Sequence, residues 1–120
     1  MLVRTVHVMT RLQLSDRDAT ALDEFARRVR ARLGANLVGL KLFGSKARGD
    51  AAPDSDLDVL VLVAGDRSEA GDAALDIAFD VNLAHDVYVS PRVIDFAVLE
   101  HPVWRITPFV QALEREGIPL

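Results

Sequence analysis

Two aspartates, Asp56 and Asp58, stand on alternate residues at the start of a strongly apolar run that continues to Val63. Side chains alternate across a strand, so both carboxylates should project from the same face. Two carboxylates this close repel each other unless a cation lies between them. Hard oxygen ligands suit magnesium or manganese, and magnesium usually combines one or two carboxylates with phosphate oxygens and water. The pair therefore predicts a metal site that acts on a phosphate.

A Gly-Ser pair followed by basic residues precedes these aspartates. Gly44 would let the backbone approach a ligand closely, because it has no side chain. Ser45 offers a hydroxyl and, with Gly44, backbone N–H groups at the start of a helical turn, a place that attracts phosphate. Arg48 could neutralise phosphate charge. Lys46 could do the same, but a surface lysine is the better explanation of it. Taken singly, a Gly-Ser pair is usually a turn and an Asp-x-Asp pair is usually solvated charge, but their combination favours a nucleotide site.

The spacing of apolar residues predicts the elements that position these motifs. The first is a helix over about 16 to 33, capped by Ser15 and ended by Gly34. In a second helix, from Ser68, apolar residues at helical spacing predict a buried stripe of Ala74, Leu75, Ala78, Phe79 and Leu83. The remaining expected elements are strands over 3–9, 37–43, 57–63 and 86–89, a helical piece over 92–99 and a last helix from Thr107 to Gly117.

Chain direction adds a third carboxylate, Asp86, to the expected site. The connection between strands 37–43 and 57–63 is short, so those strands should be antiparallel neighbours. The connection from the second strand to the one beginning at Asp86 contains a whole helix, so that pair should be parallel. Asp86 would then lie at the same sheet edge as Asp56 and Asp58, where it could bind a second ion or activate a hydroxyl.

Other readings of the acidic and basic residues stay open. Asp86 could instead begin a strand or cap a helix. Asp76 and Asp80 are rivals for the third carboxylate, although a solvated helix face explains them better. The arginines of the first helix are better explained as a solvated face than as an RNA-binding or partner surface.

Composition limits the classes of function. The chain has 120 residues and half of them are hydrophobic, so we expect a single domain over 1–120 with its own core. There is no cysteine, which excludes disulfides, thiolate catalysis and Cys-ligated metals. The net charge of −4 argues against direct nucleic acid binding through bulk charge. We also expect a cytoplasmic, soluble protein with no membrane association, because the sequence shows neither a signal-peptide pattern nor an apolar run of transmembrane length.

The string from Gly44 to Asp50, with Ser55-Asp56-Leu57-Asp58 after it, resembles the signature of the minimal nucleotidyltransferases of the DNA polymerase β-like superfamily. The resemblance implies an α/β (α+β) fold with a small mixed sheet flanked by helices. It also implies that Gly44, Ser45 and Arg48 bind the nucleotide. The metal-binding and catalytic carboxylates would be Asp56, Asp58 and, with a weaker match, Asp86.

The same resemblance implies an activity and a partner. Such enzymes transfer a nucleoside monophosphate, here most plausibly AMP from ATP, with Mg²⁺ or Mn²⁺ as cofactor. Small members occur beside a HEPN-domain toxin and neutralise it by modifying a tyrosine hydroxyl. A homo- or hetero-oligomer would fit a chain without an acceptor-binding domain. The alternatives are an antitoxin that acts by binding alone and a nucleotidyltransferase that acts on a small molecule such as an antibiotic.

Overall fold

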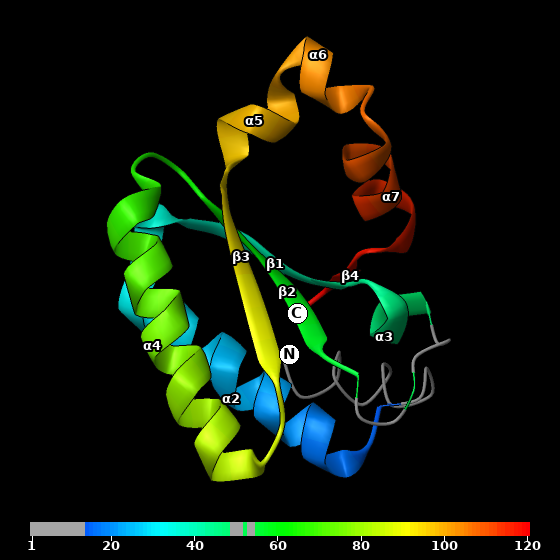
Figure 1. Ribbon diagram of the computed structural model, residues 1–120. Helices are drawn as coiled ribbons and strands as arrows, with labels where there is room; N and C mark the ends of the chain where they lie inside the picture. Colours follow the sequence, from blue (N-terminus) through cyan, green and yellow to red (C-terminus); the bar gives the residue numbers. More distant parts are fainter. Residues whose placement is uncertain (1–13, 49–51, 53–54) are drawn as a thin grey trace.

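The computed structural model describes residues 14–48, 52 and 55–120. These residues form a four-stranded sheet in the order β3-β2-β1-β4 (Figure 1). Strand β1 pairs antiparallel with β2 and with β4, and β2 pairs parallel with β3. The strands are β1 (Leu37–Phe43), β2 (Leu57–Val63), β3 (Val89–Asp95) and β4 (Ile118–Pro119).

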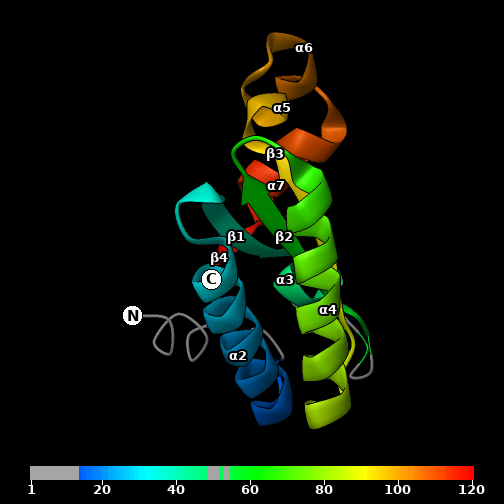
Figure 2. The same cartoon turned by 90° about the vertical axis from the view of Figure 1, so that its left-hand side faces the viewer.

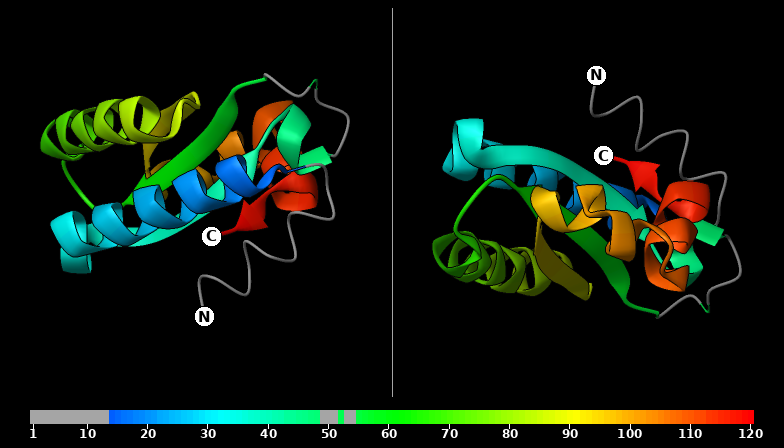
Figure 3. Two further views of the ribbon diagram at one scale, coloured as in Figure 1. Left: turned by 90° about the horizontal axis from the view of Figure 1, so that it is seen from below. Right: turned by 90° about the horizontal axis from the view of Figure 1, so that it is seen from above.

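Helices cover both faces of this sheet, and apolar residues of β2 contribute to the core on each face. Helices α2 and α4 lie side by side on one face, as Figures 2 and 3 show, with Val59 and Val61 in the core beneath them. Leu60 and Leu62 turn to the other face, where Leu113 of α7 packs with them. The helices are α2 (Asp16–Leu33), α3 (Ser45–Arg48), α4 (Arg67–His85), α5 (Phe96–Glu100), α6 (Pro102–Arg105) and α7 (Pro108–Glu116), with a 3₁₀ turn, η1 (Gly34–Asn36), after α2.

Both ends of α2 agree with the sequence. The backbone N–H of Asp18 donates to the Ser15 hydroxyl at 3.0 Å, which satisfies one of the first-turn donors. Gly34 has a φ of 54°, a left-handed conformation that ends the helix at little cost. The predicted helix over 16 to 33 is confirmed.

The predicted buried stripe of α4 is wrong for three of its five residues. Ala74 and Ala78 are buried as expected, together with other small or branched residues of that face. Leu75, Phe79 and Leu83 are 60%, 64% and 71% exposed. Apolar residues at helical spacing occur on both faces of this helix, so periodicity alone could not tell which face meets the sheet.

The predicted strand over 86–89 and helical piece over 92–99 have wrong bounds, although residue 89 lies in a strand and residues 96–99 are helical as expected. Strand β3 begins at Val89 and runs to Asp95, and α5 follows from Phe96. Pro91 suggested a strand end, but β3 is an edge strand, where a proline is tolerated. The side chain of Asn82, from α4, binds both the N–H and the carbonyl of Val89 on that open edge, at 2.7 and 3.2 Å.

The last helix is confirmed, whereas the first predicted strand cannot be placed. In α7 the Thr107 hydroxyl accepts the N–H of Val110, and Pro108 occupies the first turn. The strand expected over 3–9 lies outside the described residues. In the ranges that the structure describes, no helix is both long and apolar enough to cross a membrane.

Candidate active site

The aspartate pair stands where three segments of the chain meet. Asp58 lies opposite Phe43 of β1 and opposite Ser90 of β3. Gly44 follows Phe43 directly, so the Gly-Ser turn comes to the start of β2, as the short connection predicted. Asp56 precedes β2 and is exposed, whereas Asp58 is half-buried.

Gly44 touches the Asp58 carboxylate closely. An added Cβ at this position would lie 2.5 Å from Asp58 Oδ2, too near for any side chain. The φ of Gly44 is +78°, a conformation that disfavours residues other than glycine. The bare backbone of the turn is therefore packed against the carboxylate.

The surroundings of Asp58 disfavour its negative charge. Burial is the larger influence that raises the pKa of Asp58, and repulsion from Asp56 raises it further. Attraction to Arg92 partly lowers that pKa. A carboxylate pair in this state fits a hard cation, which would relieve the repulsion, with phosphate oxygens and water completing its shell.

Arg92 also links the site to α7. Its guanidinium lies 5.9 Å from the centre of the Phe109 ring, within range of a cation–π interaction. Phe109 meets Phe43 edge to face, with ring centres 6.3 Å apart. Two aromatic rings and a cation therefore extend the site along the sheet face that α7 covers.

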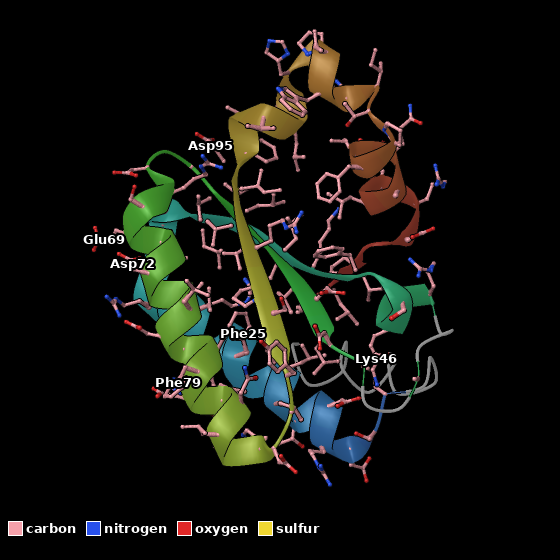
Figure 4. All side chains as sticks on the ribbon, viewed as in Figure 1. Phe25, Lys46, Glu69, Asp72, Phe79 and Asp95 are labelled. Atoms are coloured by element: carbon pink, nitrogen blue, oxygen red, sulfur yellow. The ribbon has the colours of Figure 1, made fainter. Side chains whose placement is uncertain are left out.

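Lys46 is not the surface lysine that the sequence favoured. Its side chain is buried, and Nζ lies 3.0 Å from Asp18 Oδ2 of α2. Figure 4 shows Lys46 between α3 and the start of α2. The lysine thus ties the Gly-Ser turn to the core and is not directed at a phosphate. Arg48, at the end of α3, is more exposed and lies 3.6 Å from Glu116 Oε2 of α7.

Asp86 does not join the aspartate pair. It ends α4 in a left-handed conformation, its side chain is 97% exposed, and it lies 3.4 Å from Arg17. Within the described ranges no three carboxylate or histidine side chains are close enough to share a metal ion. The expected set of three metal ligands is therefore not assembled. The physical reason is the length of α4, which places Asp86 before the strand and not in it.

Ser90 and Arg92 occupy the face of β3 where a third carboxylate was expected. Ser90 lies opposite Asp58, and Arg92 is the next residue on the same face. Sequence reasoning missed both, because it ended the strand at Pro91. An edge-strand reading of that proline would have found them. Of the rival carboxylates, Asp80 pairs with Arg28 at 3.0 Å on the outer surface.

A surface hollow lies away from this site. It is lined by Ala64, Gly65, Phe96 and neighbouring residues, beyond the end of β2 opposite to Asp58. The aspartate pair and this hollow therefore lie at different ends of the sheet. The candidate site is assigned from its residues and not from the hollow.

Comparison with known proteins identifies the family of the chain. The model of the nucleotidyltransferase domain family matches residues 22–111, which include β1, β2 and β3. The chain belongs to the nucleotidyltransferase domain family. The matched segment of this nucleotidyltransferase domain contains Gly44, Ser45, Asp56 and Asp58.

Two similar proteins give further context for this nucleotidyltransferase domain. One, from Methanocaldococcus jannaschii, bears the name "Putative protein adenylyltransferase MJ1305" and is 31% identical over 77 residues. The match covers 62% of this chain and 52% of that protein, so the chain spans about half the length of the curated relative. The other is a crystal structure of the toxin–antitoxin pair MntA–HpeT with a tyrosine-to-alanine substitution. It is 22% identical, with a TM-score of 0.46, over 79% of this chain and 67% of that one.

Proposed function

We propose that this nucleotidyltransferase domain transfers AMP from ATP to a hydroxyl group of a partner protein. The observation that carries the proposal is the contact between the bare backbone of Gly44 and the half-buried Asp58, with Asp56 beside it. A phosphate held at the turn would lie next to the carboxylates that hold its metal ion. The protein acceptor is supported by the name of the similar archaeal protein.

The residues have separate roles in this proposal. Asp56 and Asp58 would hold a magnesium ion, and that ion would supply positive charge beside the phosphates. The backbone of Gly44 and the hydroxyl of Ser45 bind phosphate oxygens, and Arg48 adds positive charge at the end of the same short helix. The acceptor oxygen bonds to the α-phosphorus, the bond from that phosphorus to the bridging oxygen breaks, and pyrophosphate leaves with release of the hydroxyl proton.

The acceptor that we propose to test first is a tyrosine of a HEPN-domain toxin. The motif from Gly44 to Asp58 is similar to that of small nucleotidyltransferases that occur beside such toxins. In this proposal the nucleotidyltransferase is the antitoxin, and AMP on the tyrosine inactivates its partner.

Labelled ATP tests the proposal directly. The purified protein is incubated with Mg²⁺, ATP labelled at the α-phosphate and the HEPN-domain toxin that a neighbouring gene would encode. The label on the toxin is then measured. We expect transfer by the wild type and none by Asp58→Asn, which keeps the shape of the side chain but loses its charge. The control is Asp66→Asn, since Asp66 caps α4 through Ser68 N–H and asparagine caps equally well. Undiminished labelling by Asp58→Asn would show that the proposed site is wrong.

A second function is favoured by one observation, the absence of Asp86 from the site. With Ser90 and Arg92 on β3 in its place, the protein would act as an antitoxin by binding alone. Cell survival separates the two functions. A catalytic antitoxin with Asp58→Asn fails to protect cells that express the toxin, whereas a binding antitoxin with the same change still protects them.

A further inference from the structure

Three large apolar residues are exposed on the outer face of α4, in the second half of the helix. Leu75, Phe79 and Leu83 follow one another at intervals of four residues, so they line one side of the helix, and they are 60%, 64% and 71% exposed. We call these three residues the outer stripe. The opposite face of α4 packs on the sheet mainly through small residues: Ala70, Ala73, Ala74, Ile77, Ala78 and Val81.

This distribution is the reverse of that of an ordinary surface helix. A helix on a globular surface turns its large apolar residues inward and its polar residues outward, and a helix that is apolar on both faces is usually covered on both. Here alanines meet the core, and a phenylalanine and two leucines meet solvent. Single exposed apolar residues are common, but a row of three large ones on one helix face marks an interaction surface.

Acidic residues border the outer stripe. Asp72 and Asp76 are exposed on the same side of α4, and Asp80 continues their row toward α2, where it pairs with Arg28. Figure 4 shows Asp72, Glu69 and Phe79 on the side of α4 that faces away from the sheet. The charge beside the apolar surface is therefore negative.

We propose that the outer stripe docks an amphipathic helix of a partner protein whose apolar side is bordered by lysine or arginine. Leucine and phenylalanine side chains fit the apolar row of such a helix, and Asp72 and Asp76 fit its basic border. A second copy of this chain fits less well. If two α4 helices paired antiparallel through Phe79, the acidic border of each would lie beside that of the other, and like charges repel.

This surface is separate from the candidate active site and goes beyond the proposed function. The outer stripe lies on the solvent side of α4, which covers one face of the sheet, whereas Leu60 and Asp58 turn to the face that α7 covers. Docking there requires no nucleotide. It would hold a partner protein while leaving the Gly44–Asp58 site accessible.

Designed peptides test the proposal without knowledge of the natural partner. The probe is a fluorescent helical peptide of about 20 residues, long enough to form a helix, with leucines in one row and lysines beside it. A second peptide replaces the lysines by glutamates. By fluorescence anisotropy we expect the lysine peptide to bind the full chain about tenfold more tightly than the glutamate peptide, and less tightly as salt rises.

Two variants locate the binding. Phe79→Gln should weaken the lysine peptide about tenfold, and the double variant Asp72→Asn with Asp76→Asn should remove the preference for lysine. Ile106→Gln is the control, because Ile106 is also a large apolar residue that is mostly exposed, at 73%, but it lies after α6. All variants change exposed residues, so circular dichroism should show wild-type melting.

Three results would overturn the proposal. The first is equal affinity for the two peptides, and the second is affinity that Phe79→Gln leaves unchanged. The third is a dimer in light scattering of the wild type that Phe79→Gln converts to monomer, which would assign the outer stripe to a second copy of the chain.

Discussion

Gly44 and Asp58 act as a single unit at the residue scale. The glycine has both a positive φ and a carboxylate oxygen in the space of its missing side chain. Both features disfavour every other residue, so we infer that this glycine supports local structure as well as the proposed phosphate contact. The same packing contributes to the burial that raises the pKa of Asp58.

Gly44→Ala should therefore impair both folding and activity. The left-handed backbone alone costs alanine about 1–2 kcal/mol, and the new methyl group must displace Asp58. We expect a lower free energy of unfolding in urea and loss of AMP transfer. Gly71→Ala is the matched control: nothing lies within 4 Å of an added Cβ there, and Gly71 is inside α4. That change should stabilise the protein by about 0.5–1 kcal/mol. Equal effects of the two substitutions would refute the structural role assigned to Gly44.

The sequence predicted some site residues well and others poorly. The connection between β1 and β2 is short, and it joins the segment with Gly44 to the segment with Asp56 and Asp58. The proximity of these residues therefore follows from chain direction alone. Asp86 depended on where a helix stops. Because α4 continues to His85, the backbone of Asp86 ends the helix and its carboxylate pairs with Arg17. Strand β3 begins three residues later than predicted, at Val89 and not at Asp86. Ser90 and Arg92 therefore stand where the carboxylate was expected.

At the scale of elements, polar contacts join α2 to α4 beside their apolar packing. Glu24 Oε1 of α2 lies 2.9 Å from His85 Nε2, and Arg28 contacts both Glu24 and Asp80. The hydrogen bond from His85 is the largest influence that lowers the pKa of Glu24 below its ordinary value, and Arg28 lowers it further. These contacts fix the last turn of α4, where the chain turns toward β3.

The Glu24 contacts should give a pH-dependent stability. Folding lowers the pKa of Glu24, so the stabilisation is present above its ordinary pKa and is lost as pH falls through the lowered pKa of the folded state. Glu24→Gln should thus reduce the free energy of unfolding at neutral pH by no more than about 1 kcal/mol, since solvent screens the pair. In acid the wild type and the variant should converge, as urea titrations across this range would show. Glu114→Gln, on the exposed side of α7, controls for the change of charge. A difference in stability that grew as the pH fell would mean that folding raises the pKa of Glu24, contrary to this prediction.

The success of prediction differed between elements for physical reasons. Helix α2 has strong end signals, Ser15 and Gly34, and one apolar face, so its bounds were predictable. In α4 both faces are apolar, and only packing against the sheet decides that the alanines face inward. In β3 the proline indicated a strand end, and only the position of the strand at the sheet edge makes Pro91 acceptable.

At the scale of the whole molecule, charge opposes binding to nucleic acid. The net charge is −4, and several arginines of the described surface are engaged in contacts with acidic or carbonyl groups, as Arg17 and Arg28 are with Asp86 and Asp80. A protein of this net charge lacks the bulk attraction to a phosphate backbone that supplies most non-specific affinity for nucleic acid.

We therefore expect no binding of a fluorescent DNA or RNA duplex at physiological salt, with anisotropy unchanged up to about 10 μM protein. The same titration with the lysine-bearing helical peptide serves as a positive control for the labelled-probe method. Saturable duplex binding in the low micromolar range would show that a local basic surface outweighs the net charge.

Among the strands of the described residues, both edge strands carry a proline, Pro91 in β3 and Pro119 in β4. Asn82 occupies the N–H and carbonyl of Val89 on the outer side of β3, and alternation places the missing N–H of Pro91 on that same side. An incoming strand would find one pair of groups already bonded and the next donor absent. The outer edge of β3 therefore disfavours pairing with a strand of another copy of the chain. Many copies could be present in a crowded cell without their sheets joining at this edge into fibrils.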